Sequence, residues 1–310
     1  MQEPIAKYFH AGLIHPMAYP QVIKGDGPIL ETLKKILDDV YFGAVEVTWM
    51  QDSSVRAEAA RMLKCAHMDV VFAGQPPLLT QKLDLNSADE SERGKAVDQC
   101  KNSVDQAYEL GARILALLSG PDPADGNRKA ATDRLADSLI QICSYASAKG
   151  NGRPLTVSLE TFDRTIDKKC LIGPTDEAVA LAERVKARCP NFGLTVDLSH
   201  QPLLDESINQ MVIKAGEHLV HAHIGNCVMR DTSSPAYGDQ HPAFGCECGE
   251  NDVDEVAEFL KVLMDIGFFK KEVPTSMPVV SFEVKPLPGE DSEVVVAGAK
   301  RVLNEAWLKI

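Results

Sequence analysis

The feature that most constrains the fold of this chain is a regular alternation of short apolar runs with longer helical patterns. The strand-like runs, in chain order, are 12–18, 43–49, 69–74, 113–120, 154–160, 192–200, 219–226 and 278–286. Each is followed by apolar residues at helical spacing, and after the first run these are Ile29, Leu33, Ile36, Leu37 and Val40. Such alternation predicts a parallel sheet, because each return to the same sheet edge requires a helical crossover.

Eight such units in 310 residues favour one (β/α)8 barrel, predicted as a single domain over residues 1–310. An open doubly wound sheet is the alternative, but no glycine-rich dinucleotide fingerprint follows the first run. Residues 226–251 lack clear periodicity and predict a long loop after the seventh strand. In a barrel of this kind, functional side chains are expected at the C-terminal ends of the strands.

Composition and charge narrow the classes of partner. A net charge of −13 and a pI of about 5.1 argue against a broad nucleic-acid surface, so we expect no nucleic-acid partner. No run approaches the length of a membrane span and the start lacks the features of a signal peptide, so we expect no membrane association and a cytoplasmic location. The dispersed cysteines predict reduced thiols. The sequence leaves open whether the chain forms a homo-oligomer.

The last four strand-like runs share an alternation of side-chain type. In the final run, Val280, Phe282 and Val284 alternate with Ser281 and Glu283. Since strand side chains alternate between two faces, the apolar set is expected to face the helices and the other set the barrel axis. The same parity in the preceding runs predicts one group of inward side chains at the barrel mouth, namely Glu160, Asp197, His223 and Glu283.

Three carboxylates and one imidazole in one pocket require a positive counter-charge, because the carboxylates repel one another. Taken singly, each residue has an ordinary structural explanation, such as a helix cap or a core histidine. Four at matching depth on successive strands favour a site for one divalent metal ion. The oxygen-rich ligand set favours Mn²⁺, with Mg²⁺, Co²⁺ or Zn²⁺ as alternatives.

The motifs SLETFD, VDLSH, HAHIGN and SFEVKP make the chain resemble the xylose isomerase-like TIM barrels, which include sugar 3-epimerases, inosose dehydratase and endonuclease IV. The resemblance implies that Glu160, Asp197, His223 and Glu283 hold the metal. It further implies that Glu160 and Glu283 transfer protons and that His200 contacts the substrate. The arginine that follows the histidine in the epimerases falls on Met229 here, so the neighbouring Arg230 is the candidate for that contact.

These features predict a divalent-metal-dependent isomerase or epimerase for a sugar or polyol-derived ketone, with a small carbohydrate as its substrate. A proton is removed next to a carbonyl that the metal polarises. A lyase is the alternative, either a dehydratase similar to inosose dehydratase or an enzyme that cleaves glycosides, since both begin with the same proton abstraction. An endonuclease IV-like repair enzyme is disfavoured by the few histidines and the acidic balance. A non-catalytic sugar-binding barrel is disfavoured by the complete ligand set.

Further residues are predicted at the rim of the mouth. Substrate contacts are expected from His15, Glu46, Trp49, His241 and Lys285. Glu46 has inward parity in the second run, and Lys285 shares the parity of Glu283. An alternative for the long loop is a second, structural zinc site formed by Cys227, His241, Cys246 and Cys248, although their spacing matches the usual zinc motifs weakly.

Overall fold

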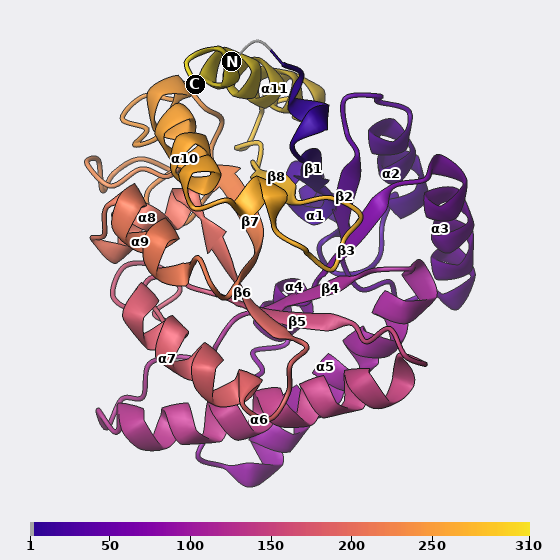
Figure 1. The fold of residues 1–310 in the computed structure, drawn as a ribbon, viewed down its shortest axis with the longest axis vertical. Coiled ribbons are helices and arrows are strands. Elements are labelled where there is room, and N and C mark those ends of the chain that lie inside the picture. Colours follow the sequence, from indigo (N-terminus) through magenta and orange to yellow (C-terminus); the bar gives the residue numbers. More distant parts are fainter. Residues whose placement is uncertain (1–2) are drawn as a thin grey trace.

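A computed structural model describes residues 3–310 as a closed barrel of eight parallel strands (Figure 1). The strands are β1 (His10–Ile14), β2 (Ala44–Val47), β3 (Asp69–Ala73), β4 (Ile114–Leu117), β5 (Thr156–Glu160), β6 (Phe192–Asp197), β7 (Leu219–Gly225) and β8 (Val279–Glu283). They pair in sequence order, and β8 closes the barrel against β1. The predicted (β/α)8 barrel is therefore confirmed.

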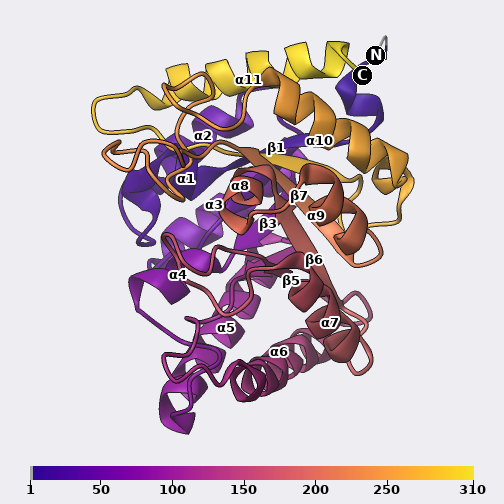
Figure 2. The same ribbon diagram turned by 90° about the vertical axis from the view of Figure 1, so that its left-hand side faces the viewer.

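Helices surround the strands, as the ring in Figure 1 and the side view in Figure 2 show. The α-helices are α1 (His15–Ala18), α2 (Ile29–Leu37), α3 (Ser53–Ala66), α4 (Gln75–Thr80), α5 (Glu90–Leu110), α6 (Arg128–Lys149), α7 (Thr175–Lys186), α8 (Gln201–Leu204), α9 (Ile208–Ala215), α10 (Val253–Asp265) and α11 (Ser292–Leu308). Short 3₁₀ turns are η1 (Ile5–Lys7), η2 (Pro20–Val22), η3 (Leu198–His200) and η4 (Phe268–Lys270). None of the helices in the described part of the chain is long and apolar enough to cross a membrane.

Local sequence signals set the ends of the long helices. Asp52, Asp89 and Asp291 precede α3, α5 and α11, and each carboxylate accepts hydrogen bonds from backbone N–H groups of the first turn. Helix α5 ends at Leu110, and the following Gly111 has a φ of 79°, the left-handed conformation that glycine adopts without strain. These caps fix where each crossover returns to the barrel.

The apolar face of the strands packs outward against the helices. Phe282 of β8 is fully buried, with ring centroids 6.2 Å from Phe42 and 6.4 Å from Tyr41. Trp307 of α11 lies 5.7 Å from Phe9, so the last helix covers the start of the barrel. The outward orientation of the apolar set leaves the polar set to fill the barrel interior.

Two expectations about the first unit are wrong. Residues 12–18 do not form one strand, because β1 ends at Ile14 and α1 begins at His15 with Pro16 in its first turn, where proline favours a helix. Val40 does not continue the apolar face of α2, since that helix ends at Leu37 and the Val40 side chain is fully exposed.

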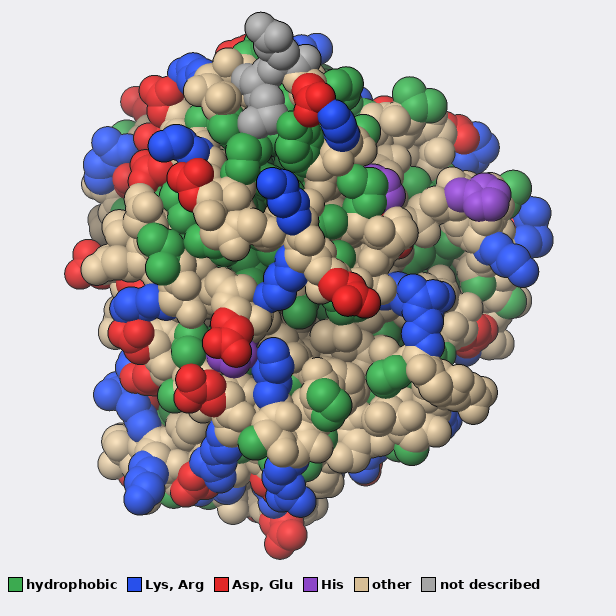
Figure 3. Space-filling view, in the orientation of Figure 1, with side chains coloured by type: hydrophobic (Ala, Val, Ile, Leu, Met, Phe, Trp, Pro, Cys, Tyr) green, Lys and Arg blue, Asp and Glu red, His purple; other side chains and the backbone are tan. Residues whose placement is uncertain are grey.

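The segment between β7 and α10 folds back on itself without a helix or strand of its own. The Gly238 N–H donates to the Val228 carbonyl at 2.9 Å, and the Glu250 N–H donates to the Cys227 carbonyl at 2.9 Å. These bonds fix the loop beside the end of β7. On the face that Figure 3 presents, acidic and basic side chains are interspersed.

Candidate metal centre and adjoining cavity

Four side chains from successive strands meet inside the barrel. Glu160, Asp197 and Glu283 are the last residues of β5, β6 and β8, and His223 of β7 pairs with Asp197 in the strand register. All four side chains are buried, and their potential ligand atoms lie within 4.8 Å of one another. A cation at this position would thus be reached by side chains from four separate strands.

The donor set of this cluster fits a divalent cation. Nδ1 of His223 lies 2.9 Å from Glu283 Oε2 and 3.1 Å from Glu160 Oε1. One ring nitrogen carries at most one proton, so it cannot donate to both carboxylates at once. Burial acts to lower the pKa of His223, but Glu46 and Glu160 outweigh burial and raise that pKa well above its usual value. The cluster therefore favours positive charge at its centre, as oxygen-rich sites for divalent metals do.

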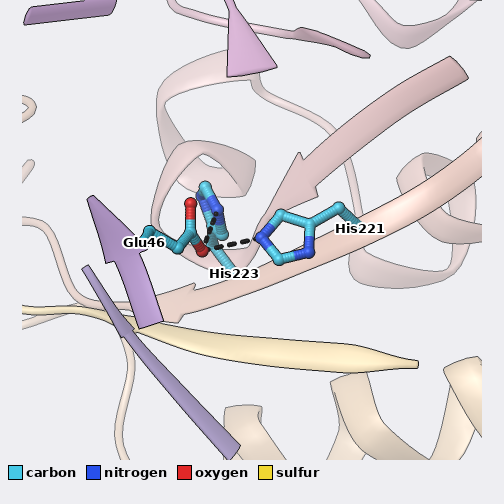
Figure 4. Close-up of side chains that lie close together, drawn as sticks. All are labelled: Glu46, His221 and His223. Carbon is cyan, nitrogen blue, oxygen red and sulfur yellow. Dashed lines mark hydrogen bonds and ion pairs between the residues drawn. The ribbon is translucent and has the colours of Figure 1, made fainter. Parts of the chain in front are cut away.

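Behind His223, a second layer of contacts orients its ring (Figure 4). Oε1 of Glu46 accepts a hydrogen bond from Nε2 of His221 at 2.7 Å and lies 3.1 Å from Nε2 of His223. Burial alone would raise the pKa of Glu46, but the two imidazoles lower it below its usual range. Glu46 thus holds Nε2 of His223 and leaves Nδ1 to face the carboxylates, an arrangement common around metal-ligating histidines. This inward position follows the parity of Glu46 in β2.

A second buried group adjoins the first. Oδ1 of Asp239 lies 3.0 Å from Nε2 of His200 and 2.8 Å from Nε2 of His241, and its Oδ2 lies 2.8 Å from Nζ of Lys168. Asp197, His200 and His241 also have potential ligand atoms within 4.8 Å of one another. Burial would raise the pKa of Asp239, but the histidines and Lys168 hold it well below its usual value.

Sequence reasoning missed Asp239 and Lys168 as parts of this site. Asp239 and Lys168 lie in loops, where no periodicity indicates the direction of a side chain. The one available signal is the spacing of two ligand-type residues in GDQH, Asp239 and His241. Their contact with His200 depends on how two distant loops come together.

A cavity of about 210 Å³ opens beside the cluster. Of the predicted site residues, it is lined by Glu46, His223, His241, Glu283 and Lys285. Gln75 and Lys168 line it as well, and Gln75 Nε2 donates to Glu160 Oε2 at 2.7 Å. Glu160 itself does not line the cavity, so Glu283 is the more accessible of the two glutamates proposed to transfer protons.

Four residues that were predicted to contact substrate lie outside the cavity wall, namely His15, Trp49, His200 and Arg230. His200 is fully buried, with its ring nitrogens facing the Thr161 carbonyl and Asp239. His15 is buried and its Nε2 lies 2.7 Å from Thr32 Oγ1, because the chain turns into α1 at this position. Trp49 donates from Nε1 to the Ile23 carbonyl at 3.1 Å, which holds its ring against the loop before α2. Arg230 is 66% exposed and pairs with Glu250 at 3.0 Å, because its loop turns away from the barrel there.

The alternative zinc site in the long loop is not assembled. His241 is directed to Asp239 and Glu283, and Cys246 Sγ lies 3.4 Å from the side-chain nitrogen of Asn226. Each of the eight cysteines is free, and no cysteine belongs to a metal-type cluster within residues 3–310. The loop therefore contributes His241 to the group at the barrel mouth.

Taken together, the closed barrel and its buried cluster of carboxylates and histidines define a TIM barrel with a candidate metal centre at the C-terminal ends of its strands. The chain belongs to the xylose isomerase-like TIM barrel family, whose model matches residues 38–280.

Solved structures with the same fold include sugar-converting enzymes. An L-ribulose 3-epimerase is similar with a TM-score of 0.72 at 17% identity, covering 97% of this chain and 96% of the other. An IOLI protein with a bound zinc atom is similar with a TM-score of 0.72 at 15% identity, covering 97% of this chain and 99% of the other. An AP endonuclease, family 2, from Brucella melitensis is similar with a TM-score of 0.67 at 21% identity, covering 94% of this chain and 98% of the other. At these identities the likeness establishes the fold.

Proposed function

We propose that this protein is a divalent-metal-dependent isomerase or epimerase acting on a sugar or polyol-derived ketone. The observation that carries the proposal is the convergence of Glu160, Asp197, His223 and Glu283 beside a cavity large enough for a small molecule. The names of the structural neighbours, which include sugar epimerases, agree with it. Mn²⁺ suits three carboxylates and one imidazole best, with Mg²⁺, Co²⁺ and Zn²⁺ as alternatives.

The metal, when bound by these four residues, acts as a Lewis acid that makes a C–H bond next to the substrate carbonyl more acidic. Glu283 lines the cavity and takes that proton. Returning the proton to the neighbouring carbon gives isomerisation. Epimerisation requires a second group on the opposite face, and Glu160, oriented by the hydrogen bond from Gln75 to its Oε2, is the candidate.

His200 and His241 position the substrate through their place beside the cluster. His200 is fixed because its Nδ1 donates to the Thr161 carbonyl at 2.8 Å and its Nε2 faces Asp239. His241 lines the cavity and its Nε2 lies 3.3 Å from Glu283 Oε1. His241 is therefore held where it can orient a substrate hydroxyl near the reacting carbon, and His200 acts through Asp239, which lines the cavity and contacts both imidazoles.

The proposal is tested by incubating metal-loaded protein with a panel of ketoses and inososes in D₂O and following deuterium incorporation by NMR. We expect exchange at a carbon next to the carbonyl, lost after chelation and lost in Glu283→Gln. Glu272→Gln, which changes an exposed glutamate before β8, is the matched control. Absence of bound divalent metal in reloaded protein, or full exchange by Glu283→Gln, contradicts the proposal. Signals of an elimination product in the same spectra would instead identify the enzyme as a lyase.

A further inference from the structure

Two lysines line the cavity, and their charges are compensated unequally. Lys168 lies after β5 and its Nζ is 2.8 Å from Asp239 Oδ2 and 3.5 Å from Asp167 Oδ2. Lys285 follows β8 and its Nζ donates to Gln240 Oε1 at 2.9 Å. Among residues 3–310, no carboxylate forms an ion pair with Lys285. One of the two cations is therefore neutralised by the protein, and the other is not.

The acidic groups near Lys285 are already engaged. Oδ2 of Asp167 accepts from Gln240 Nε2 at 2.9 Å and from the Asp239 N–H at 3.0 Å. Asp239 is shared among Lys168, His200 and His241. A partly buried ammonium with three donors and one neutral acceptor retains hydrogen-bonding capacity and uncompensated charge. An anion in the cavity would satisfy both.

The position of Lys285 is fixed by the fold. Its backbone N–H donates to the His241 carbonyl at 2.7 Å, which ties the end of β8 to the long loop. Lys285 also lies two residues beyond Glu283, so along an extended chain the two Cα atoms are about 7 Å apart. Both side chains line the same cavity, so a short sugar chain can present a reacting carbonyl to Glu283 and an anionic group to Lys285.

The other basic side chains that line the cavity are paired with carboxylates: Lys168 and His241 with Asp239, and His223 with Glu160 and Glu283. Elsewhere Ile14, Met17, Leu79 and Phe162 make the wall apolar, and Gln75 and Thr80 add neutral polar groups to it. An anionic group is therefore expected at Lys285, the lining cation that has no carboxylate partner among residues 3–310, and this orients the substrate relative to Glu283.

We propose that the cavity recognises a sugar derivative with a terminal anionic group, a carboxylate or a phosphate, that pairs with Lys285 beside Lys168. The inference rests on the proposed function, because it names the substrate class of the same site. A charge-assisted hydrogen bond of this kind separates charged from neutral substrates by about tenfold or more.

The test compares fructose, fructuronate and fructose 6-phosphate, which share a carbon skeleton and differ at the terminal carbon. Binding to the metal-loaded protein is measured by calorimetry and deuterium exchange by NMR. We expect one or both anions to bind at least about tenfold more tightly than fructose, and Lys285→Met to reduce that ratio by about tenfold. Lys169→Met, which removes an exposed charge from the same loop as Lys168, is expected to keep the ratio.

Preference for fructuronate alone assigns a sugar acid, and preference for fructose 6-phosphate alone assigns a sugar phosphate. Equal binding of fructose and both anions, or an unchanged ratio in Lys285→Met, overturns the inference. If Lys285→Met does not fold, as judged by circular dichroism, Lys285→Gln takes its place. Anion binding that depends on Lys285 without any exchange would refute the proposed function alone, and exchange without charge preference would refute this inference alone.

Discussion

Oε1 of Glu46 lies 3.1 Å from Nε2 of His223, and the same oxygen accepts a hydrogen bond from His221. This contact spans the barrel interior from β2 to β7. It fixes which nitrogen of His223 faces Glu160 and Glu283, so a residue that lies behind the proposed metal ligands determines their orientation.

Glu46→Gln is therefore expected to weaken metal binding by about 10- to 100-fold, the usual effect of losing an outer partner of a ligating histidine. Competition with a chelating indicator measures this affinity directly. Glu272→Gln serves as the control because its side chain is exposed and it precedes β8, whereas Glu283 lies at the C-terminal end of that strand. An unchanged affinity in Glu46→Gln would show that His223 does not need this acceptor.

Gln75 holds Glu160 through a hydrogen bond of 2.7 Å. In Gln75→Leu one carboxylate oxygen loses its donor, and we expect deuterium exchange to slow by about tenfold because Glu160 is no longer oriented. Gln81→Leu, at an exposed position after α4, is the matched control. Equal exchange rates in the two variants would assign Gln75 a packing role.

Metal binding is expected to stabilise the fold, since the ligands come from β5, β6, β7 and β8 and separate on unfolding. At a metal concentration 100 times the dissociation constant, the gain is about 2.7 kcal/mol. Thermal unfolding with Mn²⁺ and after chelation measures it. Glu283→Gln should lose most of the metal-dependent increase in Tm, and a full increase in that variant would exclude Glu283 as a ligand.

His15 is predicted to make stability depend on pH. Burial lowers its pKa in the folded protein to about 3 from the ordinary histidine value of 6.5. Between these values the unfolded chain binds a proton that the folded chain does not, so stability falls as pH drops below 6.5. The slope from this one group approaches about 1.4 kcal/mol per pH unit.

Urea unfolding of the wild type and His15→Gln, from pH 7.5 down to about pH 5, isolates this contribution as a difference between two curves. The variant is expected to lose less stability per pH unit below about 6.5. Parallel curves throughout would mean that His15 has the same pKa in the folded and the unfolded chain.

Phe282 packs β8 against Tyr41 and Phe42, two aromatic residues in the connection between α2 and β2. Phe282→Ala is expected to lower the free energy of unfolding by about 3 to 5 kcal/mol, through lost burial and the cavity left behind. Leu308→Ala, whose side chain is 74% exposed, should change it by less than about 0.5 kcal/mol. Chemical denaturation separates the two variants, and a small effect at Phe282 would indicate that the core closes over the gap.

Much of the fold and the arrangement of the four proposed ligands can be predicted from sequence because both depend on local periods. Alternation with a period of two sends Glu160 and Glu283 inward while Phe282 packs outward. The parity of Glu46 likewise predicts its inward position. Helix caps such as Asp89 are visible as single residues before an amphipathic pattern.

Only the tertiary structure decides which loop residues join the site. His241 and Arg230 belong to the same aperiodic segment, yet His241 lines the cavity and Arg230 pairs with Glu250 at the surface. Lys285 has the inward parity of β8, but its lack of an acidic partner depends on how Asp167, Asp239 and Gln240 come together. The physical reason is that strand parity is set by neighbouring residues. Loop conformation is set by long-range hydrogen bonds, such as that from the Lys285 N–H to the His241 carbonyl.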